Sequence, residues 1–225
     1  MPARGFPGRV PPLSAPRGFF CWSGYTGAMA TVRFATPEDA QEIREIYAPY
    51  CALGSPVSFE VVPPSVDEMG GRISRTLERF PWLVCQRGDL VAGYVYAGPH
   101  RERTAYQWSV EVTAYIHPAH QRRGLASALY GALFQLLAAQ GYVTAYAGIT
   151  LPNPASVGLH ERMGFEPVGI YKSVGFKCGS WQDVGWWRLL LQPPPQQPSP
   201  PRPYQNLSPA IVTGILDRSS ALLKC

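Results

Sequence analysis

The sequence predicts a mixed α/β fold in which one central sheet is packed between helices. Three patterns in residues 31–192 lead to this prediction. Short segments alternate apolar and polar residues, as strands do, and longer segments place apolar residues at helical spacing. The two kinds of segment alternate along the chain, and the last two strand segments, residues 168–174 and 184–191, follow each other as a hairpin. This order is typical of a mixed sheet covered by helices.

The first strand and the first helix are expected next to each other. Residues 31–35 alternate as a strand, and Thr36 then has the properties of a helix N-cap. Pro37 suits the first helical position, and two acidic residues follow it in the first turn. We expect this helix to run to about Ala48, where Pro49 helps to stop it.

A second helix and a hairpin follow a proline-containing loop that is well placed to border a substrate site. Ser65 and Glu68 form the pattern of a capping box, so a helix is expected from there to about Phe80. Residues 82–86 and 90–97 are apolar runs separated by Arg-Gly-Asp. This arrangement predicts two antiparallel strands joined by a tight turn.

The centre of the chain contains its most regular pattern. A long strand is expected over residues 105–116, and apolar residues at helical spacing predict a helix over residues 124–140 that ends at Gly141. A strand over residues 143–149 should follow. After a Pro-Asn-Pro break, a short helix is expected to end at Gly164.

The net charge of +5 is carried by the two ends of the chain. Residues 1–30 contain three arginines and no acidic residue, and residues 193–225 contain three basic residues and one acidic residue. Residues 31–192 therefore carry equal numbers of basic and acidic side chains, which predicts no nucleic-acid partner. The sequence contains no apolar run long enough to cross a bilayer, so we expect no membrane partner either.

The five cysteines are scattered, without close pairs or accompanying histidines. This spacing favours neither a disulfide scaffold nor a zinc site, and no metal is expected. Cys85 lies in an apolar run and is expected to be buried. A reducing, cytoplasmic location fits these cysteines best.

Three regions are expected. Residues 1–30 would be a flexible extension, and Met29 is an alternative start because it leads directly into the first strand. Residues 31–192 would form one domain. Residues 193–225 begin with a proline-rich run and are expected to be a disordered tail. Apolar residues between 209 and 223 leave open that this part docks on the domain.

The run from Gln121 to Ala126 places two arginines and Gly124 directly before the central helix. A helix N-terminus presents unpaired backbone N–H groups and the positive end of the helix dipole, so it binds phosphate oxygens through the main chain. Alone, such a run is more often an ordinary solvated helix start. The strand before it and Asn153 after it favour the pyrophosphate of coenzyme A instead.

This ordered set of motifs resembles the GNAT superfamily of acyl-CoA N-acyltransferases over about residues 31–191. Within the superfamily, the second half of that range is similar to phosphinothricin and methionine sulfoximine acetyltransferases. The shared motifs are Ser109-Val110-Glu111, His117-Pro118, Gly175-Phe176-Lys177 and Trp181-Gln182-Asp183-Val184. The resemblance implies the GNAT fold and acetyl-CoA as the acetyl donor.

Two residues are candidates for acid/base chemistry. An amino-acid amine is mostly protonated at neutral pH, since its pKa is about 8 in peptides, so a base must remove a proton before attack. The resemblance implies that Glu111 is this base, directly or through water; without it, a solvated strand glutamate would be the better interpretation. His160 lies near the place where many GNAT enzymes carry a tyrosine that protonates the coenzyme thiolate. It would be an acid, a relay or a structural residue.

The resemblance also implies binding residues. The backbone of Tyr115 and Ile116 would pair with the pantetheine arm, and a nearby amide would polarise the thioester carbonyl. Asn153 would bind the arm or only form a turn. The expected coenzyme-binding residues are Ala114, Tyr115, Ile116, Arg122, Arg123, Gly124, Leu125, Ala126, Ser127 and Asn153. The expected substrate-binding residues are Arg101, Glu102, Arg103, Val112 and Thr113. Arginine forks suit carboxylate or phosphinate oxygens, although a solvated charged turn is nearly as good an interpretation.

The resulting prediction is acetyl transfer from acetyl-CoA to the amino group of a small amino-acid-like substrate of the phosphinothricin or methionine sulfoximine type. The amine would attack directly, with Glu111 as general base. Two alternatives stay open: acetylation of a polyamine or a protein N-terminus, and a non-catalytic acetyl-CoA-binding module. Relatives of this kind are often dimers, which leaves a homodimer open, with Trp181, Trp186 and Trp187 as interface or core residues.

Overall fold

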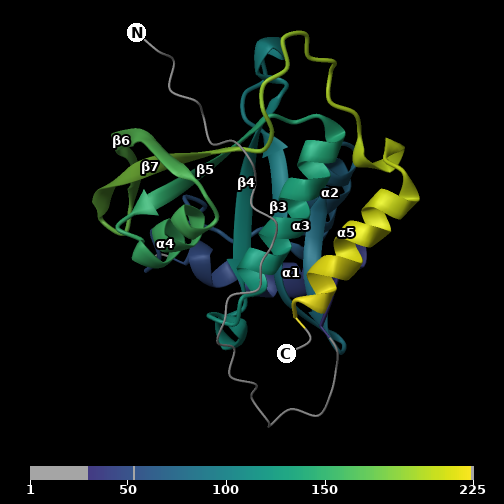
Figure 1. The fold of residues 1–225 in the computed structure, drawn as a ribbon. Coiled ribbons are helices and arrows are strands. Elements are labelled where there is room, and N and C mark those ends of the chain that lie inside the picture. Colours follow the sequence, from purple (N-terminus) through teal and green to yellow (C-terminus); the bar gives the residue numbers. More distant parts are fainter. Residues whose placement is uncertain (1–29, 53, 224–225) are drawn as a thin grey trace, which may run out of the picture.

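The computed structural model describes residues 30–52 and 54–223 as a seven-stranded sheet with helices on both faces (Figure 1). The strands are β1 (Ala30–Phe34), β2 (Trp82–Arg87), β3 (Leu90–Pro99), β4 (Ser109–Ile116), β5 (Thr144–Leu151), β6 (Glu166–Lys177) and β7 (Ser180–Leu190). The helices are α1 (Ala40–Cys51), α2 (Val66–Leu77), α3 (Leu125–Gln140), α4 (Pro154–Arg162) and α5 (Pro209–Ala221). The predicted mixed α/β fold is confirmed. The predicted extension over residues 1–30 lies outside the described residues, apart from Ala30.

The strand order is β1-β2-β3-β4-β5-β7-β6, and every neighbouring pair is antiparallel except β4 and β5. The parallel pairing of β4 with β5 covers only residues 109–111 and 144–146. Beyond these residues β5 stays paired with β7, while β4 stays paired with β3. In Figure 1, strands β5, β7 and β6 diverge from β4, so the sheet is split along its centre.

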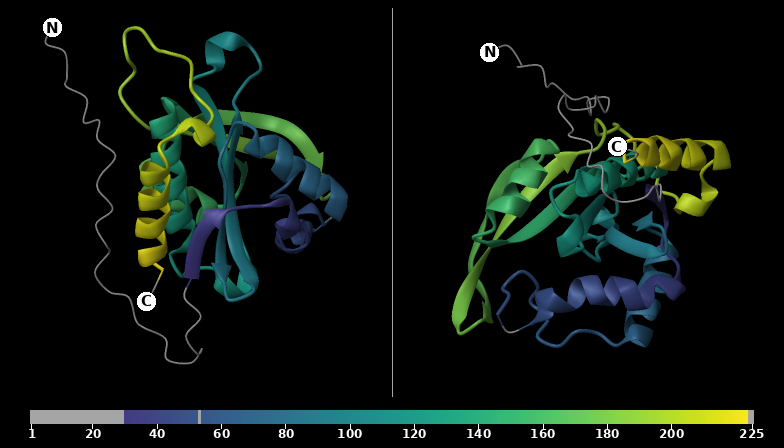
Figure 2. Two further views of the ribbon diagram at one scale, coloured as in Figure 1. Left: turned by 90° about the vertical axis from the view of Figure 1, so that its right-hand side faces the viewer. Right: turned by 90° about the horizontal axis from the view of Figure 1, so that it is seen from below.

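Two helical layers cover the sheet (Figure 2). α1 and α2 pack on one face, around a core that includes Ile43, Ile73 and Tyr94. α3 packs on the other face, and α5 lies beside it. α3 is consequently apolar nearly all round, as expected for a helix covered on two sides. The predicted burial of Cys85 is confirmed, since it is fully buried in β2.

The predicted ends of α3 are confirmed. Gly124 precedes the helix at φ 78°, and Gly141 follows it at φ 100°. Both values lie in the left-handed region, which costs a glycine little and other residues about 1 kcal/mol or more. The predicted capping box of α2 is also present: Ser65 Oγ accepts from the Glu68 N–H, and the Glu68 carboxylate accepts from the Ser65 N–H.

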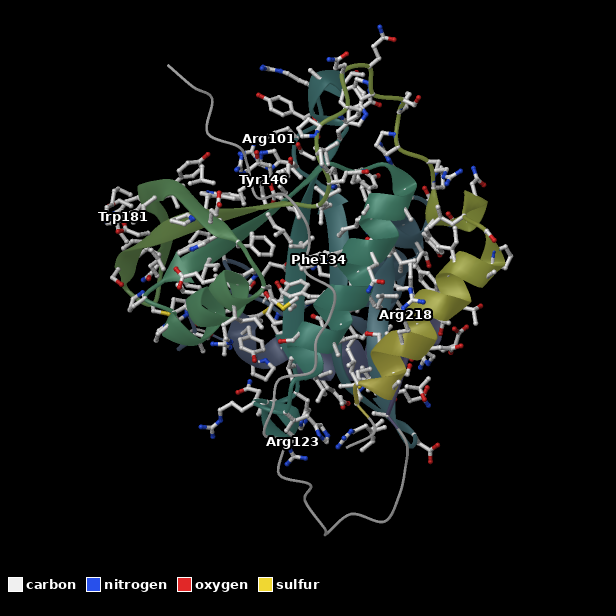
Figure 3. All side chains as sticks on the ribbon, viewed as in Figure 1. Arg101, Arg123, Phe134, Tyr146, Trp181 and Arg218 are labelled. Carbon is white, nitrogen blue, oxygen red and sulfur yellow. The ribbon has the colours of Figure 1, made fainter. Side chains whose placement is uncertain are left out.

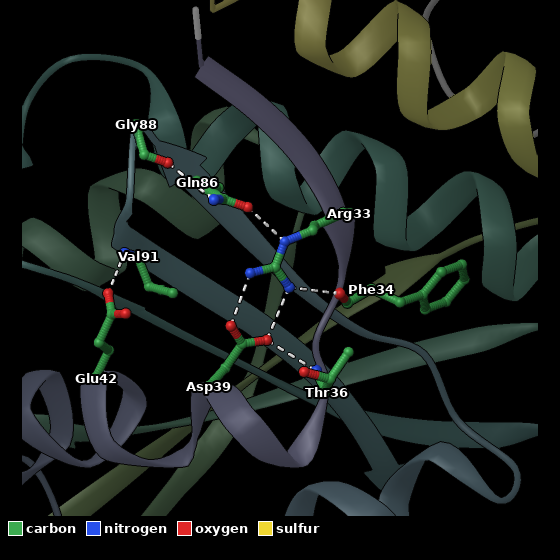
Figure 4. Close-up of polar contacts among 8 residues, drawn as sticks. All are labelled: Arg33, Phe34, Thr36, Asp39, Glu42, Gln86, Gly88 and Val91. Atoms are coloured by element: carbon green, nitrogen blue, oxygen red, sulfur yellow. Dashed lines mark hydrogen bonds and ion pairs between the residues drawn. The ribbon is translucent and has the colours of Figure 1, made fainter. Parts of the chain in front are cut away.

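An ion pair fixes the link between β1 and α1 (Figure 4). The Arg33 guanidinium donates two hydrogen bonds of 2.7 Å to the Asp39 carboxylate, which also accepts from the Thr36 N–H at 2.8 Å. Burial acts to raise the pKa of Asp39, but the hydrogen bonds from Arg33 and Thr36 outweigh it and lower that pKa. These bonds fix the orientation of α1 relative to β1 and the sheet.

Two predicted boundaries were wrong. α1 does not stop at Pro49 but continues to Cys51, since a proline in the last turn removes only one helical hydrogen bond. The strand predicted over residues 105–116 begins only at Ser109. The residues just before it form a 3-10 turn (Thr104–Tyr106), closed by backbone hydrogen bonds.

The end of the chain differs from the predicted disordered tail. Residues 193–203 form no regular element, but α5 follows them and packs against α3 and β1. Ser219 Oγ donates to the carbonyl oxygen of Ala128, and Ile215 is buried. The prediction of disorder was wrong for this part, because the proline-rich composition precedes an apolar helix that docks on the domain.

Candidate active site

The site begins where the two halves of the sheet part. Glu111 and Tyr146 form the last residue pair of the β4-β5 ladder, after which the strands diverge. On β4, Val110 and Val112 point into the core around α3, so Glu111 between them points to the α1/α2 face. On the same face, Gly98 of β3 lies directly opposite Glu111, and a Cβ added there would have no atom of the described residues within 4 Å. Glu111 therefore borders open space.

The Glu111 carboxylate is held by two neighbours. Its Oε1 lies 3.1 Å from His100 Nδ1 and 3.1 Å from Arg101 Nη1. The His100 ring stacks on Tyr146 at 4.3 Å between centroids, and the Arg101 guanidinium lies over the Trp186 ring. Arg101 and Tyr146 lie close together near one end of the sheet in Figure 3. The predicted substrate-binding Arg101 thus contacts the predicted base.

The phosphate turn lies at the opposite end of β4. Figure 3 places Arg123 there, far from Arg101. Arg122 has φ 59° and Gly124 has φ 78°, so the chain turns sharply into α3. α3 has no side-chain cap, and its first helical bond runs from the Ala128 N–H to the Gly124 carbonyl. The N–H groups of the first turn, which include the predicted residues Leu125, Ala126 and Ser127, are thus placed for an anion.

An open strand edge joins the two ends. β4 has no β5 partner from Val112 to Ile116, which includes the predicted Ala114 and Tyr115. At about 3.3 Å per residue, the distance from Glu111 to Ile116 is about 17 Å. An extended amide-containing chain bound at the phosphate turn can pair with this edge and bring its far end to Glu111. The arrangement fits an acyl-coenzyme A.

A pocket of about 190 Å³ lies on the α1/α2 face of the sheet. Aromatic rings from α1, β2, β3 and β4 line it, together with the Glu60–Arg72 ion pair at 2.7 Å. The lining residues are Tyr47, Glu60, Met69, Arg72, Thr76, Trp82, Tyr94, Tyr96 and Tyr115. Tyr96 of β3 lies opposite Thr113 of β4. Thr113 is two residues from Glu111 along β4, on the same face of the sheet. The pocket wall at Tyr96 is therefore next to the predicted Thr113, on the face of the sheet that carries Glu111.

His160 lies on the other face of the sheet. It is 5% exposed, its Nε2 is 3.1 Å from the Tyr130 hydroxyl of α3, and its Nδ1 is 2.8 Å from the Ser156 carbonyl. Burial lowers its pKa, against the effect of the Ser156 carbonyl. Both ring nitrogens have protein partners, and Glu111 is not among them. The two predicted acid/base residues are not brought together.

The remaining predicted residues differ in their surroundings. Asn153 caps α4, since its Oδ1 accepts from the Ser156 N–H at 3.1 Å. Val112 is buried in the core around α3 rather than facing the site. Glu102 and Arg103 are exposed in the loop before β4. His100 is absent from the predicted site residues, because only the β3-β4 register places it beside Glu111.

The split sheet, the open strand edge and the uncapped helix together define the class of acyl-CoA-dependent acyltransferases. A family model described as an acetyltransferase (GNAT) domain matches residues 32–186. The chain belongs to the GNAT family and is an N-acetyltransferase.

Curated relatives cover most of this domain. The chain is 41% identical over 177 residues to the phosphinothricin N-acetyltransferase of Streptomyces viridochromogenes, covering 79% of this chain and 94% of that protein. It is 31% identical over 161 residues to the L-methionine sulfoximine/L-methionine sulfone acetyltransferase of Salmonella typhimurium, covering 72% and 94%.

A solved structure supports the fold. The phosphinothricin acetyltransferase of Sinorhizobium meliloti, in complex with acetyl-CoA, matches with a TM-score of 0.71 and 33% identity. The match covers 78% of this chain and 98% of that one. None of the helices in residues 30–52 and 54–223 is long and apolar enough to traverse a membrane. In the same ranges, no group of three or more His, Cys, Asp or Glu side chains is placed to hold a metal ion.

Proposed function

We propose that this protein transfers acetyl from acetyl-CoA to the amino group of a small amino-acid-like substrate, of the phosphinothricin or methionine sulfoximine type. The position of Glu111 carries the proposal. It lies where β4 and β5 part, at the end of the open strand edge that starts at the phosphate turn, and it faces the space beside Gly98. A thioester and an amine are expected to meet at this point.

In the proposed reaction, Glu111 takes a proton from the acceptor ammonium. The neutral nitrogen attacks the thioester carbonyl directly, and the tetrahedral intermediate collapses to the N-acetyl product and coenzyme A. Backbone amides of the open β4 edge are the candidate donors to the developing oxyanion. An acid/base role for His160 stays a prediction; its buried contacts with Tyr130 and Ser156 fit a structural role.

The pocket on the face of the sheet that carries Glu111 suits the side chain of the acceptor. Its aromatic walls bind the aliphatic part, and Arg72 offers a guanidinium to a carboxylate or phosphinate oxygen. Arg72 is already paired with Glu60. An anionic acceptor group would therefore either share the Arg72 guanidinium with the Glu60 carboxylate or displace that carboxylate. A long polyamine lacks the anion that this pocket can recognise.

The acceptor class is tested by measuring coenzyme A release from acetyl-CoA with purified protein. The panel contains phosphinothricin, methionine sulfoximine, ordinary amino acids, spermidine and a short peptide. Turnover restricted to the amino-acid-like compounds is expected. Preferential turnover of spermidine or the peptide would contradict the proposed acceptor class, and acetyl-CoA binding without turnover of any amine would favour a non-catalytic module.

We also propose that the protein is a homodimer through the β6-β7 hairpin. This hairpin exposes six large apolar side chains at 49% to 65%, and exposed apolar groups of this kind mark protein–protein interfaces. They are Val168, Ile170, Tyr171, Val174, Phe176 and Trp181. Trp181 faces outward in Figure 3, whereas Trp187 is buried.

The dimer is tested by sedimentation velocity. Phe176→Glu places a charge in this apolar group and is expected to give a monomer. Leu90→Glu is the matched control, because Leu90 is also exposed, at 61%, but lies on the distant β2-β3 turn. A wild-type protein that sediments as a monomer at all concentrations would refute the proposal.

A further inference from the structure

His100 is the closest neighbour of Glu111 for which neither the sequence motifs nor the comparisons suggest a role. It follows β3, and its backbone N–H donates to the Ser109 carbonyl at 3.4 Å across the β3-β4 ladder. This register places its ring on the same face as Glu111, two residues along the strand. Its Nδ1 lies 3.1 Å from Glu111 Oε1, within hydrogen-bond distance.

The contacts of the Glu111 carboxylate are one-sided. His100 and Arg101 both approach Oε1. Within the described part of the chain, Oε2 has no hydrogen-bond partner, and the space beside Gly98 is open. The carboxylate is thus tethered through one oxygen, and the other is left for a proton from the substrate.

The His100 ring is held on several sides. It stacks on Tyr146 of β5 with an interplanar angle of 16°, and it meets the edges of Tyr106 and Trp186 at 6.1 Å. Its side chain is only 14% exposed. Arg101, by contrast, is 45% exposed and contributes a more solvated contact. Aromatic packing from three elements therefore fixes the ring that reaches Glu111.

We propose that His100 is a positioning residue for acetyl transfer, which orients Glu111 by a hydrogen bond from Nδ1–H to Oε1 and so presents Oε2 to the acceptor ammonium. The inference rests on the proposed role of Glu111 as base. In the proton transfer, the N–H bond of the ammonium breaks and an O–H bond forms at Oε2. His100 keeps its own proton throughout.

The test compares His100→Phe and His100→Asn with Glu111→Gln and with the double variant. Phe keeps a ring to stack on Tyr146 but lacks the donor, whereas Asn keeps an N–H near the position of Nδ1. If the Phe variant does not fold, His100→Ala replaces it, because it removes the donor without adding bulk. Steady-state kinetics with both substrates are measured for every folded variant.

A hydrogen bond to a charged group is worth about a tenfold rate effect or more. We therefore expect His100→Phe to lower kcat at least about tenfold with an unchanged KM for acetyl-CoA, and His100→Asn to restore most of the rate. The double variant should be no slower than Glu111→Gln alone, since His100 acts only through that carboxylate.

Two results would overturn the inference while Glu111 remains the base. One is full activity of His100→Phe beside an inactive Glu111→Gln, and the other is a double variant slowed by the product of the two single effects. Full activity of Glu111→Gln would instead refute the proposed base itself, and the inference with it.

Discussion

The ammonium group of Lys177, at the end of β6, lies 2.6 Å from the backbone carbonyl oxygen of Ser58. It also donates to the carbonyls of Tyr50 and Glu60, at 3.1 and 3.0 Å, and the residue is only 4% exposed. A buried cation thus fastens the loop between α1 and α2 to the hairpin. Since Glu60 lines the aromatic pocket, the hairpin helps to shape the proposed acceptor site.

Lys177→Met should remove this attachment. Three carbonyl groups lose their charged donor, so the free energy of unfolding is expected to fall by about 3 kcal/mol. The KM for the acceptor should rise, because Glu60 lines the aromatic pocket. Urea unfolding and steady-state kinetics measure both effects.

Lys172→Met is the matched control for Lys177. Lys172 lies on the same strand but is exposed, and it pairs with Asp183 on the surface. Such pairs contribute at most about 1 kcal/mol. Equal effects of the two substitutions would refute the role assigned to Lys177.

Gly124 and Gly141 give a matched pair at the two ends of α3. Replacement of either by Ala forces a left-handed conformation on an L residue and should lower the free energy of unfolding by about 1 kcal/mol. Only Gly124→Ala should also raise the KM for acetyl-CoA, because only that end of the helix is placed for the pyrophosphate. An equal KM for the two variants would argue against the phosphate turn.

Substitution of Gly98 tests whether the acceptor amine uses the open space beside Glu111. A Cβ on Gly98 or on Gly169 of β6 would meet no neighbour within 4 Å, so Val at either position should leave the fold intact. Gly98→Val is expected to lower kcat/KM for the acceptor at least tenfold, since it fills the space that the amine needs. Gly169→Val should retain wild-type kinetics. If both variants are equally active, the amine does not approach by this route.

His160 predicts a pH dependence of stability. Burial lowers its pKa below the ordinary value of 6.5, so the unfolded chain binds more protons than the folded one below that pH. Its contribution to stability is complete above about pH 6.5 and is lost as the pH falls from there toward the folded-state pKa. His160→Gln should remove this part of the slope, measured by urea unfolding between pH 5 and 8. An unchanged slope would place the titration on other groups.

The sequence predicted those parts of the fold that local patterns determine. The capping box at Ser65 and the glycines at the ends of α3 were identified because each acts within a few residues. The docking of α5 depends on a surface that α3 presents far away in the chain. No local signal distinguishes such a helix from a free tail, although Ile215 belongs to the apolar pattern in the sequence.

The same difference separates the parts of the site. Glu111 and the turn at Gly124 lie in motifs that a sequence displays, whereas His100 becomes a neighbour of Glu111 only through the register of β3 against β4. His160 shows the converse. A histidine at this position suggested an acid/base role. Its contact with Tyr130 of α3, 30 residues away in the chain, is formed only by the folded structure.

The most direct test of the account is the pH dependence of kcat/KM for the acceptor in wild type and Glu111→Gln, with acetyl-CoA binding measured by calorimetry. The account predicts unchanged acetyl-CoA affinity and a rate loss of at least about a hundredfold at neutral pH, which is the usual size of a general-base contribution. The loss should shrink as the pH rises through the pKa of the acceptor amine, where the base is no longer needed. A variant that keeps wild-type activity at neutral pH would contradict the account.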